Sequence, residues 1–356
     1  MSNENGGIRI TLEDLEQVKT ADVVEMKAEA PASGAAYYGT ITEASGLREP
    51  VAGAKEKGNL LLQGWCYLGI AGLLGALAGW GICEPGFADN GGGVFHWGNL
   101  LMLPVLVALI AFGCGVAESI VERSMQKALV RSAMALPLGA LLGGVFYLAA
   151  NIVFGIGRGI CMMLGVTSFH NPIFWIARAV AWAVFGVAGG LVYGIVGQSF
   201  KKGKFGVLGG MLGAAVGGVV FDPICIALGG PSATLSRAVG FGLLGLATGV
   251  MMGLVESALK DRWLYVVSGP LAGKQFILYK PQTSLGSDQQ CDVYLFKDPA
   301  IQALHATLQT SGARILLRAA APVYVSGVPV SSRVLSDGDL VQIGRYSFRY
   351  KEKSRA

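Results

Sequence analysis

The stretch GLVESALKDRWLYVV, residues Gly253–Val267, joins two kinds of structure. Its first half is the apolar end of a long helical segment that suits a lipid bilayer. After the polar link Lys260–Arg262, the run Trp263–Val267 has the aromatic and β-branched residues of a strand. The sequence therefore predicts a multi-domain protein, an α-helical polytopic membrane bundle followed by an all-β sandwich.

Six stretches before this junction reach the roughly 20 apolar residues that a membrane-spanning helix needs. Of the 356 residues, 53% are hydrophobic, only 14% are charged and 53 are glycine, which is unlike a soluble domain. The predicted spans are Asn59–Cys83, Asn99–Ile120, Ser132–Phe154, Pro172–Gly197, Phe205–Ala227 and Arg237–Ala258. We expect a flexible cytosolic tail at 1–58, the six-span domain at 59–259 and the sandwich at 260–356.

Basic residues predict the orientation, because they concentrate in cytoplasmic loops. One set of connections carries most of them: Lys55, Lys57, Arg123, Lys127, Arg131, Lys201, Lys202, Lys204, Lys260 and Arg262. Both termini are therefore predicted to be cytoplasmic, in a multi-pass protein of a bacterial-type inner membrane. The polar tail shows no cleavable signal peptide, and Thr11–Val18 within it is expected to form a short amphipathic helix.

The six spans repeat internally as three helical hairpins of one type. Arg178-Ala179-Val180 matches Arg237-Ala238-Val239, and the same offset continues through later glycines of both spans. Glycines at every fourth residue form three stripes, a glycine-zipper pattern that lets helix backbones approach closely. The expected helix-packing residues are Gly186, Gly190, Gly194, Gly209, Gly213, Gly217, Gly245, Gly249 and Gly253. A narrow pore lined by glycine backbone is the alternative.

Charged residues of the spans fall near the helix ends, where side chains can reach the interface by snorkelling. Asp222 and Arg237 can form a pair across the last hairpin. The six cysteines and three histidines show no metal-binding spacing. No nucleophile, paired carboxylates or metal set is evident, so neither an enzyme, a cofactor nor a metal is predicted. The net charge of +5 suits anionic lipid and gives no reason to expect nucleic acid.

From Trp263 onward, nine short strands are predicted between turn residues, which is typical of a sandwich. They are Leu264–Ser268, Gln275–Leu278, Thr283–Leu285, Val293–Leu295, Ala306–Thr310, Ile315–Ala319, Val323–Val325, Asp339–Ile343 and Tyr346–Tyr350. Seven motifs follow one another in order: Gly273–Phe276, Ser284–Ser287, Cys291–Leu295, His305–Leu308, Val325–Val330, Leu335–Asp339 and Val341–Gly344. In this order they resemble the forkhead-associated (FHA) domain.

The resemblance implies binding of phosphothreonine peptides by loops at one end of the sandwich. The family's phosphate-binding Arg falls at Ser287, its peptide-binding Ser at Gln302, and its Asn-Gly pair at Ala321-Pro322. Only Gly286 and His305 match the pattern, and in this family that His supports the loops. The peptide-binding candidates are Gly286, Ser287, Gln302, His305, Ala321, Ser326 and Gly327. Without the bidentate cation, a phospho-independent protein contact or self-docking is expected in place of phosphothreonine binding.

Two functions remain open at this point. The first is a signalling or scaffolding adaptor that displays the FHA-like module to a cytosolic protein or peptide. The alternative is a transporter or channel that the module regulates. Mostly Gly, Ala and Leu lie at mid-depth of the spans, which favours the adaptor over a polar transport route. The sequence is compatible with a homo-oligomer and names no partner.

Overall fold

The computed structural model describes residues 60–88, 96–168, 170–228, 234–312 and 314–353. Residues 57–325 and 329–356 belong to one compact unit. The helix predicted at Thr11–Val18 lies outside the described residues. The described helices are η1 (Leu60–Leu62), α5 (Gly64–Cys83), η2 (Glu84–Gly86), α6 (Trp97–Val121), α7 (Met125–Met163), α8 (Pro172–Val196), α9 (Phe200–Ala227) and α10 (Thr234–Leu259).

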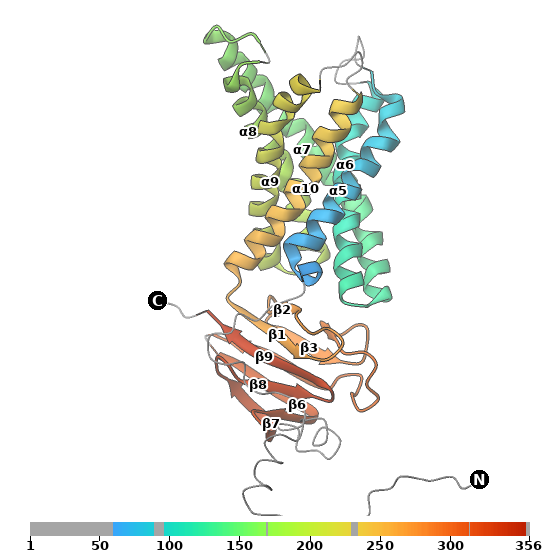
Figure 1. The fold of residues 1–356 in the computed structure, drawn as a ribbon, viewed down its shortest axis with the longest axis vertical. Helices are drawn as coiled ribbons and strands as arrows, with labels where there is room; N and C mark the ends of the chain where they lie inside the picture. The colour runs from blue at the N-terminus through green and yellow to red at the C-terminus, as the bar shows by residue number, and fades with distance from the viewer. Residues whose placement is uncertain (1–59, 89–95, 169, 229–233, 313, 354–356) are drawn as a thin grey trace, which may run out of the picture. The chain divides into compact units, whose positions relative to one another are not determined.

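The six long helices pack into one bundle (Figure 1), and their contacts close a ring. Each contacts the next along the chain, α10 returns to α5, and α6 also contacts α8. All six are long and apolar enough to cross a membrane. The protein is therefore a polytopic membrane protein.

Glycines occupy the places where neighbouring backbones meet in this ring. A Cβ on Gly190 of α8 would overlap the backbone of Gly206 and Val207 on α9. Gly213 of α9 faces the backbone of Thr248 on α10 in the same way, and Gly249 of α10 faces the carbonyl of Leu68 on α5. Each predicted stripe thus faces one neighbouring helix. Their contribution to stability stays a prediction, tested below.

The third span is much longer than its apolar run. The prediction was Ser132–Phe154, but α7 spans Met125–Met163. A helix of 39 residues measures about 58 Å, which exceeds the hydrocarbon thickness of a bilayer. Ser124 caps its start by accepting a hydrogen bond from the backbone N–H of Lys127. Hydropathy predicts only the apolar part of a helix, whereas the capping residue shows where the helix begins.

The C-terminal module is a β-sandwich of nine strands. The hydrogen-bonded order is β2-β1-β9-β8-β6-β5-β3-β4, with β7 paired to β6. The β3–β4 pair is parallel. The strands are β1 (Arg262–Ser268), β2 (Gln275–Ile277), β3 (Gln282–Gly286), β4 (Val293–Tyr294), β5 (Ala306–Ser311), β6 (Arg314–Val325), β7 (Val328–Leu335), β8 (Leu340–Ile343) and β9 (Tyr346–Glu352).

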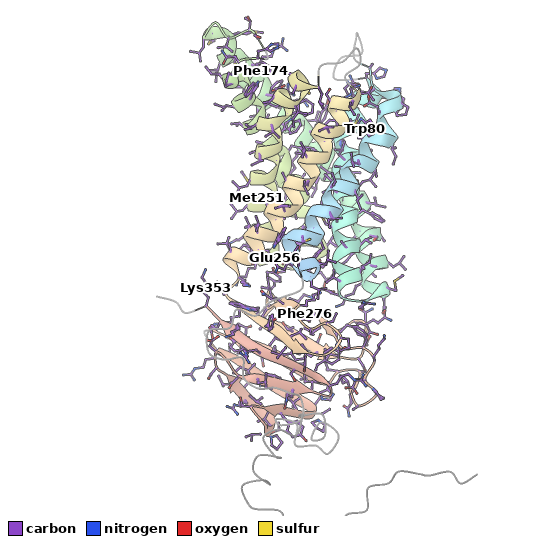
Figure 2. All side chains as sticks on the ribbon, in the orientation of Figure 1. Trp80, Phe174, Met251, Glu256, Phe276 and Lys353 are labelled. Atoms are coloured by element: carbon purple, nitrogen blue, oxygen red, sulfur yellow. The ribbon has the colours of Figure 1, made fainter. Side chains whose placement is uncertain are left out.

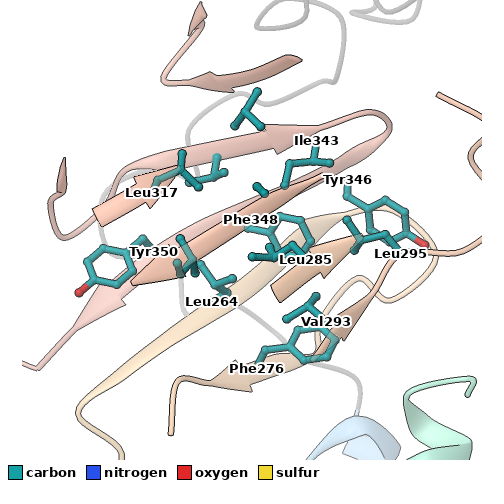
Figure 3. Close-up of a cluster of buried hydrophobic side chains, with 14 of the residues drawn as sticks. Leu264, Phe276, Leu285, Val293, Leu295, Leu317, Ile343, Tyr346, Phe348 and Tyr350 are labelled. Carbon is teal, nitrogen blue, oxygen red and sulfur yellow. The ribbon is translucent and has the colours of Figure 1, made fainter. Parts of the chain in front are cut away.

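The module has a hydrophobic core of its own (Figure 3). Alternate residues of β9, namely Tyr346, Phe348 and Tyr350, are fully buried. Leu285 of β3 and Leu317 of β6 are buried in the same core. This period of two places one face of each strand inward, as a sandwich requires.

Two strand predictions were wrong. Ile315–Ala319 and Val323–Val325 are one strand, β6, which pairs first with β5 and then with β8. Pro322 is tolerated because it lies where the pairing changes partners and no ladder N–H is needed. Strand β7 was missed, since Pro329 and the following serines weaken its β-propensity.

Candidate recognition site

Two loops, residues 287–292 and 295–305, meet the segment 320–322 of β6 at one end of the module, and together they are called the recognition end. The two loops are bonded to each other. The N–H of Ser287 donates to the carbonyl of Gln302 at 2.9 Å, and that of Asp288 donates to Ala303 at 3.2 Å. Their backbones therefore hold one another in place.

His305 joins the 295–305 loop to the segment 320–322 from a position that is only 2% exposed. Its Nδ1 accepts from the N–H of Gln302 at 3.2 Å, so the hydrogen lies on Nε2. Nε2 then donates to the carbonyl of Pro322 at 3.0 Å. The carbonyl of His305 accepts from the N–H groups of Ala320 and Ala321. With every ring nitrogen bonded to backbone, this side chain positions the loops.

Glycine is required at position 286 because the backbone of the 295–305 loop passes very close to it. A Cβ there would overlap the carbonyl oxygen of Ala303 and lie 3.1 Å from Sγ of Cys291. Any larger residue would push the 295–305 loop away from β3. The two positions that match the FHA pattern, Gly286 and His305, thus shape the recognition end.

The positions that would read a phosphopeptide carry no charge. Ser287, Gln302, Ala303 and Ala321 are uncharged, and Gln302 and Ala303 are exposed. Leu304 beside them is 48% exposed, a residue that the motif comparison did not single out. These reading positions offer backbone, amide and apolar groups to a partner, with the exposed Asp288 and Lys297 in the same loops.

Of the module cations that could replace the missing Arg, Lys297 lies in the 295–305 loop and is exposed, whereas Lys280 and Arg314 lie away from the reading positions. Lys280 precedes β3 and Arg314 begins β6, which places both at the opposite end of the strands from Gly286. Arg333 lies 3.7 Å from Asp339.

Ser326 and Gly327, two further peptide-binding candidates, form the turn between β6 and β7 with φ of 50° and 81°.

The loop 287–292 contacts the α6–α7 connector, defined here as Glu122–Lys127. The backbone N–H of Gln126 donates to Oε1 of Gln289 at 3.2 Å. Nζ of Lys127 donates to the carbonyl of Asp292 at 3.0 Å. Oγ of Ser124 donates to the carbonyl of Gln289 at 3.5 Å. The recognition end is therefore in contact with a segment of its own chain.

The same loop is anchored from within by Asp292. Its carboxylate accepts from Nζ of Lys280 at 2.9 Å and from the N–H and Oγ of Ser284 at 2.9 and 3.0 Å. Burial would raise the pKa of Asp292, but these hydrogen bonds outweigh it and lower that pKa. The ionised carboxylate thus holds the loop in the conformation that meets the connector.

A buried polar layer crosses the bundle near the end of α10 that leads to the module, where Figure 2 labels Glu256. Five helices contribute one side chain each, and these define the layer: Glu118, Arg131, Tyr193, Lys202 and Glu256. Nζ of Lys202 lies 2.5 Å from Oε1 of Glu118, and Arg131 lies 3.4 Å from the same carboxylate. The hydroxyl of Tyr193 donates to Glu256 at 3.2 Å.

Two module side chains reach this region. The hydroxyl of Tyr279 donates to Glu256. Burial and that carboxylate raise the pKa of Tyr279 well above its usual value, so the donor proton is retained. Lys274 is 4% exposed, and its Nζ lies 3.9 Å from Oε1 of Glu122. Burial lowers the pKa of Lys274 to about 8, although Glu122 and Glu118 oppose that shift.

Asp222 and Arg237 are buried against other helices instead of snorkelling, which corrects the expectation from sequence. Asp222 and Arg237 are 5% and 8% exposed. Asp222 accepts from Arg178 at 2.9 Å, and Arg237 lies 2.5 Å from Glu84, so the partners also differ from the expected pair. A buried charge is retained when a partner from another helix neutralises it.

The six cysteines are free. Among the described residues, no cluster of His, Cys, Asp or Glu has the composition to hold a metal ion.

Comparison with known proteins supports this description of the module. Residues 265–354 match the family described as "Inner membrane component of T3SS, cytoplasmic domain". The chain is 34% identical over 122 residues to the glycogen accumulation regulator GarA of Mycolicibacterium smegmatis, a match over 33% of this chain and 70% of that protein.

Two solved structures resemble the module. The FHA domain of the CT664 protein from Chlamydia trachomatis is 24% identical and covers 27% of this chain and 100% of its own, with a TM-score of 0.25. The cytoplasmic domain of the T3SS sorting platform protein PscD from P. aeruginosa is 23% identical and covers 27% and 83%, with a TM-score of 0.24.

The fold and the recognition end define a membrane protein that carries a β-sandwich recognition module. By its match to GarA, the chain belongs to the family of FHA-domain proteins. The match describes the module and leaves most of the spans without a counterpart.

Proposed function

We propose that the protein is a membrane-anchored adaptor whose FHA module binds a protein segment without requiring phosphothreonine. The spans hold the module at the bilayer, and the matched family is a membrane component with a cytoplasmic domain. We place the module and both termini in the cytoplasm of a bacterial cell, as the distribution of basic residues indicates.

One observation carries the proposal, namely that the recognition end is shaped like an FHA site without its phosphate-binding charges. Gly286 and His305 hold the loops together. The reading positions Ser287, Gln302 and Ala321 are uncharged. Phosphate is bound strongly through charge-assisted hydrogen bonds, and Arg supplies two of them in a fixed geometry. Uncharged reading positions favour an unmodified segment.

The contact with the α6–α7 connector supports the same proposal. Gln289 and Asp292 bond to the connector through backbone and amide groups, without any phosphate. The module in this protein is thus suited to an unmodified stretch of chain. We propose that an external partner competes with the connector for this loop.

A transporter or channel fits the bundle less well. The cavity beside Glu118 has a volume of about 20 Å³, room for about one water molecule. Glu118 itself is paired with Lys202 and Arg131. Paired charges beside so small a cavity hold helices together and do not suit a solute path.

The test compares two degenerate peptide pools that differ only in a central threonine or phosphothreonine. Fluorescence anisotropy on the purified full-length protein should give affinities that differ by less than about threefold. Ser287→Arg restores the missing cation and should create a preference of about tenfold for the phosphorylated pool. A strong phosphate preference in the unaltered protein would contradict the proposal.

A further inference from the structure

A polar cavity of about 340 Å³ lies at the other end of the module. Arg262 at the start of β1, the segment Leu278–Pro281 before β3, Thr310 of β5 and Lys353 after β9 line it. Strand β3 runs from this cavity to Gly286, and β5 runs from the recognition end back to it. The cavity and the recognition end therefore lie at different ends of the strands, and the pair Lys280–Asp292 links them.

The lining carries more positive than negative charge. Four cations, Lys201, Arg262, Lys280 and Lys353, face two carboxylates, Asp261 and Glu352. Lys201 pairs with Asp261, and Nε of Arg262 lies 2.8 Å from Glu352. These two pairs use both carboxylates of the lining.

The remaining two cations find their partners elsewhere. Lys280 lies 2.9 Å from Asp292, which does not line the cavity. Nζ of Lys353 donates to the backbone carbonyl of Ala258 at 3.3 Å. Asp292 balances the charge of Lys280, so the excess positive charge comes from Lys353. A phosphate group accepts charge-assisted hydrogen bonds from such a lysine and from neighbouring cations.

The cavity lies where the spans end. Lys201 is the second residue of α9, and Asp261 follows the end of α10 at Leu259. Apolar side chains are exposed at the same helix ends, with Phe200 82% and Leu259 42% exposed. Lys353, which follows the last strand of the module, lines the same cavity and is labelled in Figure 2. Cations beside exposed apolar groups match an anionic headgroup beside its acyl chains.

We propose that this cavity binds a phosphate-bearing anion, supplied in the membrane by the headgroup of an anionic phospholipid. Its volume falls in the range of small-ligand sites, roughly 300–1,000 Å³. The bound headgroup would hold the link between α10 and β1 against the bilayer. The pair between Lys280 and Asp292 links this cavity to the recognition end, so the variant Lys353→Gln, which leaves that pair intact, separates the two sites.

The experiment measures ligand-induced stabilisation of the full-length protein in detergent. Added phosphatidylglycerol should raise the melting temperature by about 3–5 °C relative to added phosphatidylcholine. Lys280→Gln/Lys353→Gln should abolish that rise. Lys351→Gln is the control, because Lys351 lies on β9 beside the cavity residues but outside the lining. If the double variant does not purify, Lys353→Gln alone should at least halve the rise.

A second arm identifies the source of the phosphate. Inorganic phosphate at millimolar concentration replaces the lipid, and a rise that depends on Lys280 and Lys353 assigns the site to a soluble phosphorylated molecule. A rise with phosphatidylglycerol alone assigns it to lipid. The proposal fails if neither probe stabilises the protein, if the double variant responds like the unaltered protein, or if only a phosphothreonine peptide stabilises it.

Discussion

Lys202→Met tests whether the polar layer stabilises the bundle. The Lys202 side chain is 5% exposed, and its Nζ lies 2.5 Å from Oε1 of Glu118. It also lies 4.2 Å from the ring centroid of Tyr193. Methionine keeps the stem of the side chain and removes its charge. Glu118 then retains the longer contact of 3.4 Å with Arg131.

The expected loss follows from burial. An exposed ion pair contributes less than about 1 kcal/mol, whereas removing one partner of a buried pair costs about 3–5 kcal/mol because a buried charge is left behind. The remaining Arg131 contact reduces this loss, and the lost contact with the Tyr193 ring adds about 0.5–2 kcal/mol. We expect the free energy of unfolding to fall by about 3 kcal/mol.

The assay is equilibrium unfolding in mixed micelles with increasing dodecyl sulfate, followed by tryptophan fluorescence. Lys204→Met is the matched control, because Lys204 is exposed and only stacks on Phe200 at 4.8 Å. It should lose less than about 1 kcal/mol. Glu118→Gln/Lys202→Met should recover part of the stability, since neither charge is then unpaired. A loss for Lys202→Met as small as that for Lys204→Met would refute the reasoning.

Two further predictions concern packing and pH. Gly190→Ala should lower the stability by at least about 2 kcal/mol. Gly189→Ala is the control and should not, because a Cβ on Gly189 meets nothing within 4 Å. Equal effects of the two variants in thermal unfolding would count against close backbone packing at Gly190. Because the pKa of Lys274 is lowered to about 8, its burial is unfavourable below pH 8 and is relieved as the pH rises toward the unfolded value. Lys274→Met should therefore be more stable than the unaltered protein by about 3 kcal/mol at pH 7. Melting curves should show this difference in stability closing by pH 10. A difference that does not change with pH would contradict the lowered pKa of Lys274.

Local signals in the sequence determined both folds. The apolar spans and the alternating strands depend on neighbouring residues, so periodicity revealed them. The motifs around Gly286 and His305 likewise identified the recognition end. The limits of α7 and the identity of β7 were not found, because the polar first turn of α7, its Gly-rich end and an edge strand with Pro329 carry little apolar signal.

Only the tertiary structure brought the charged residues together. Glu118 and Lys202 are separated by 84 positions in the sequence. Ser124 of the connector and Gln289 of the recognition end are separated by 165 positions. No local spacing encodes such pairs. The sequence showed that charges lie near the helix ends, but the ring of helices decided that they would be buried and paired. For the same reason, the strands of the module could be predicted from local sequence, while its contact with the connector depended on the tertiary packing of distant segments.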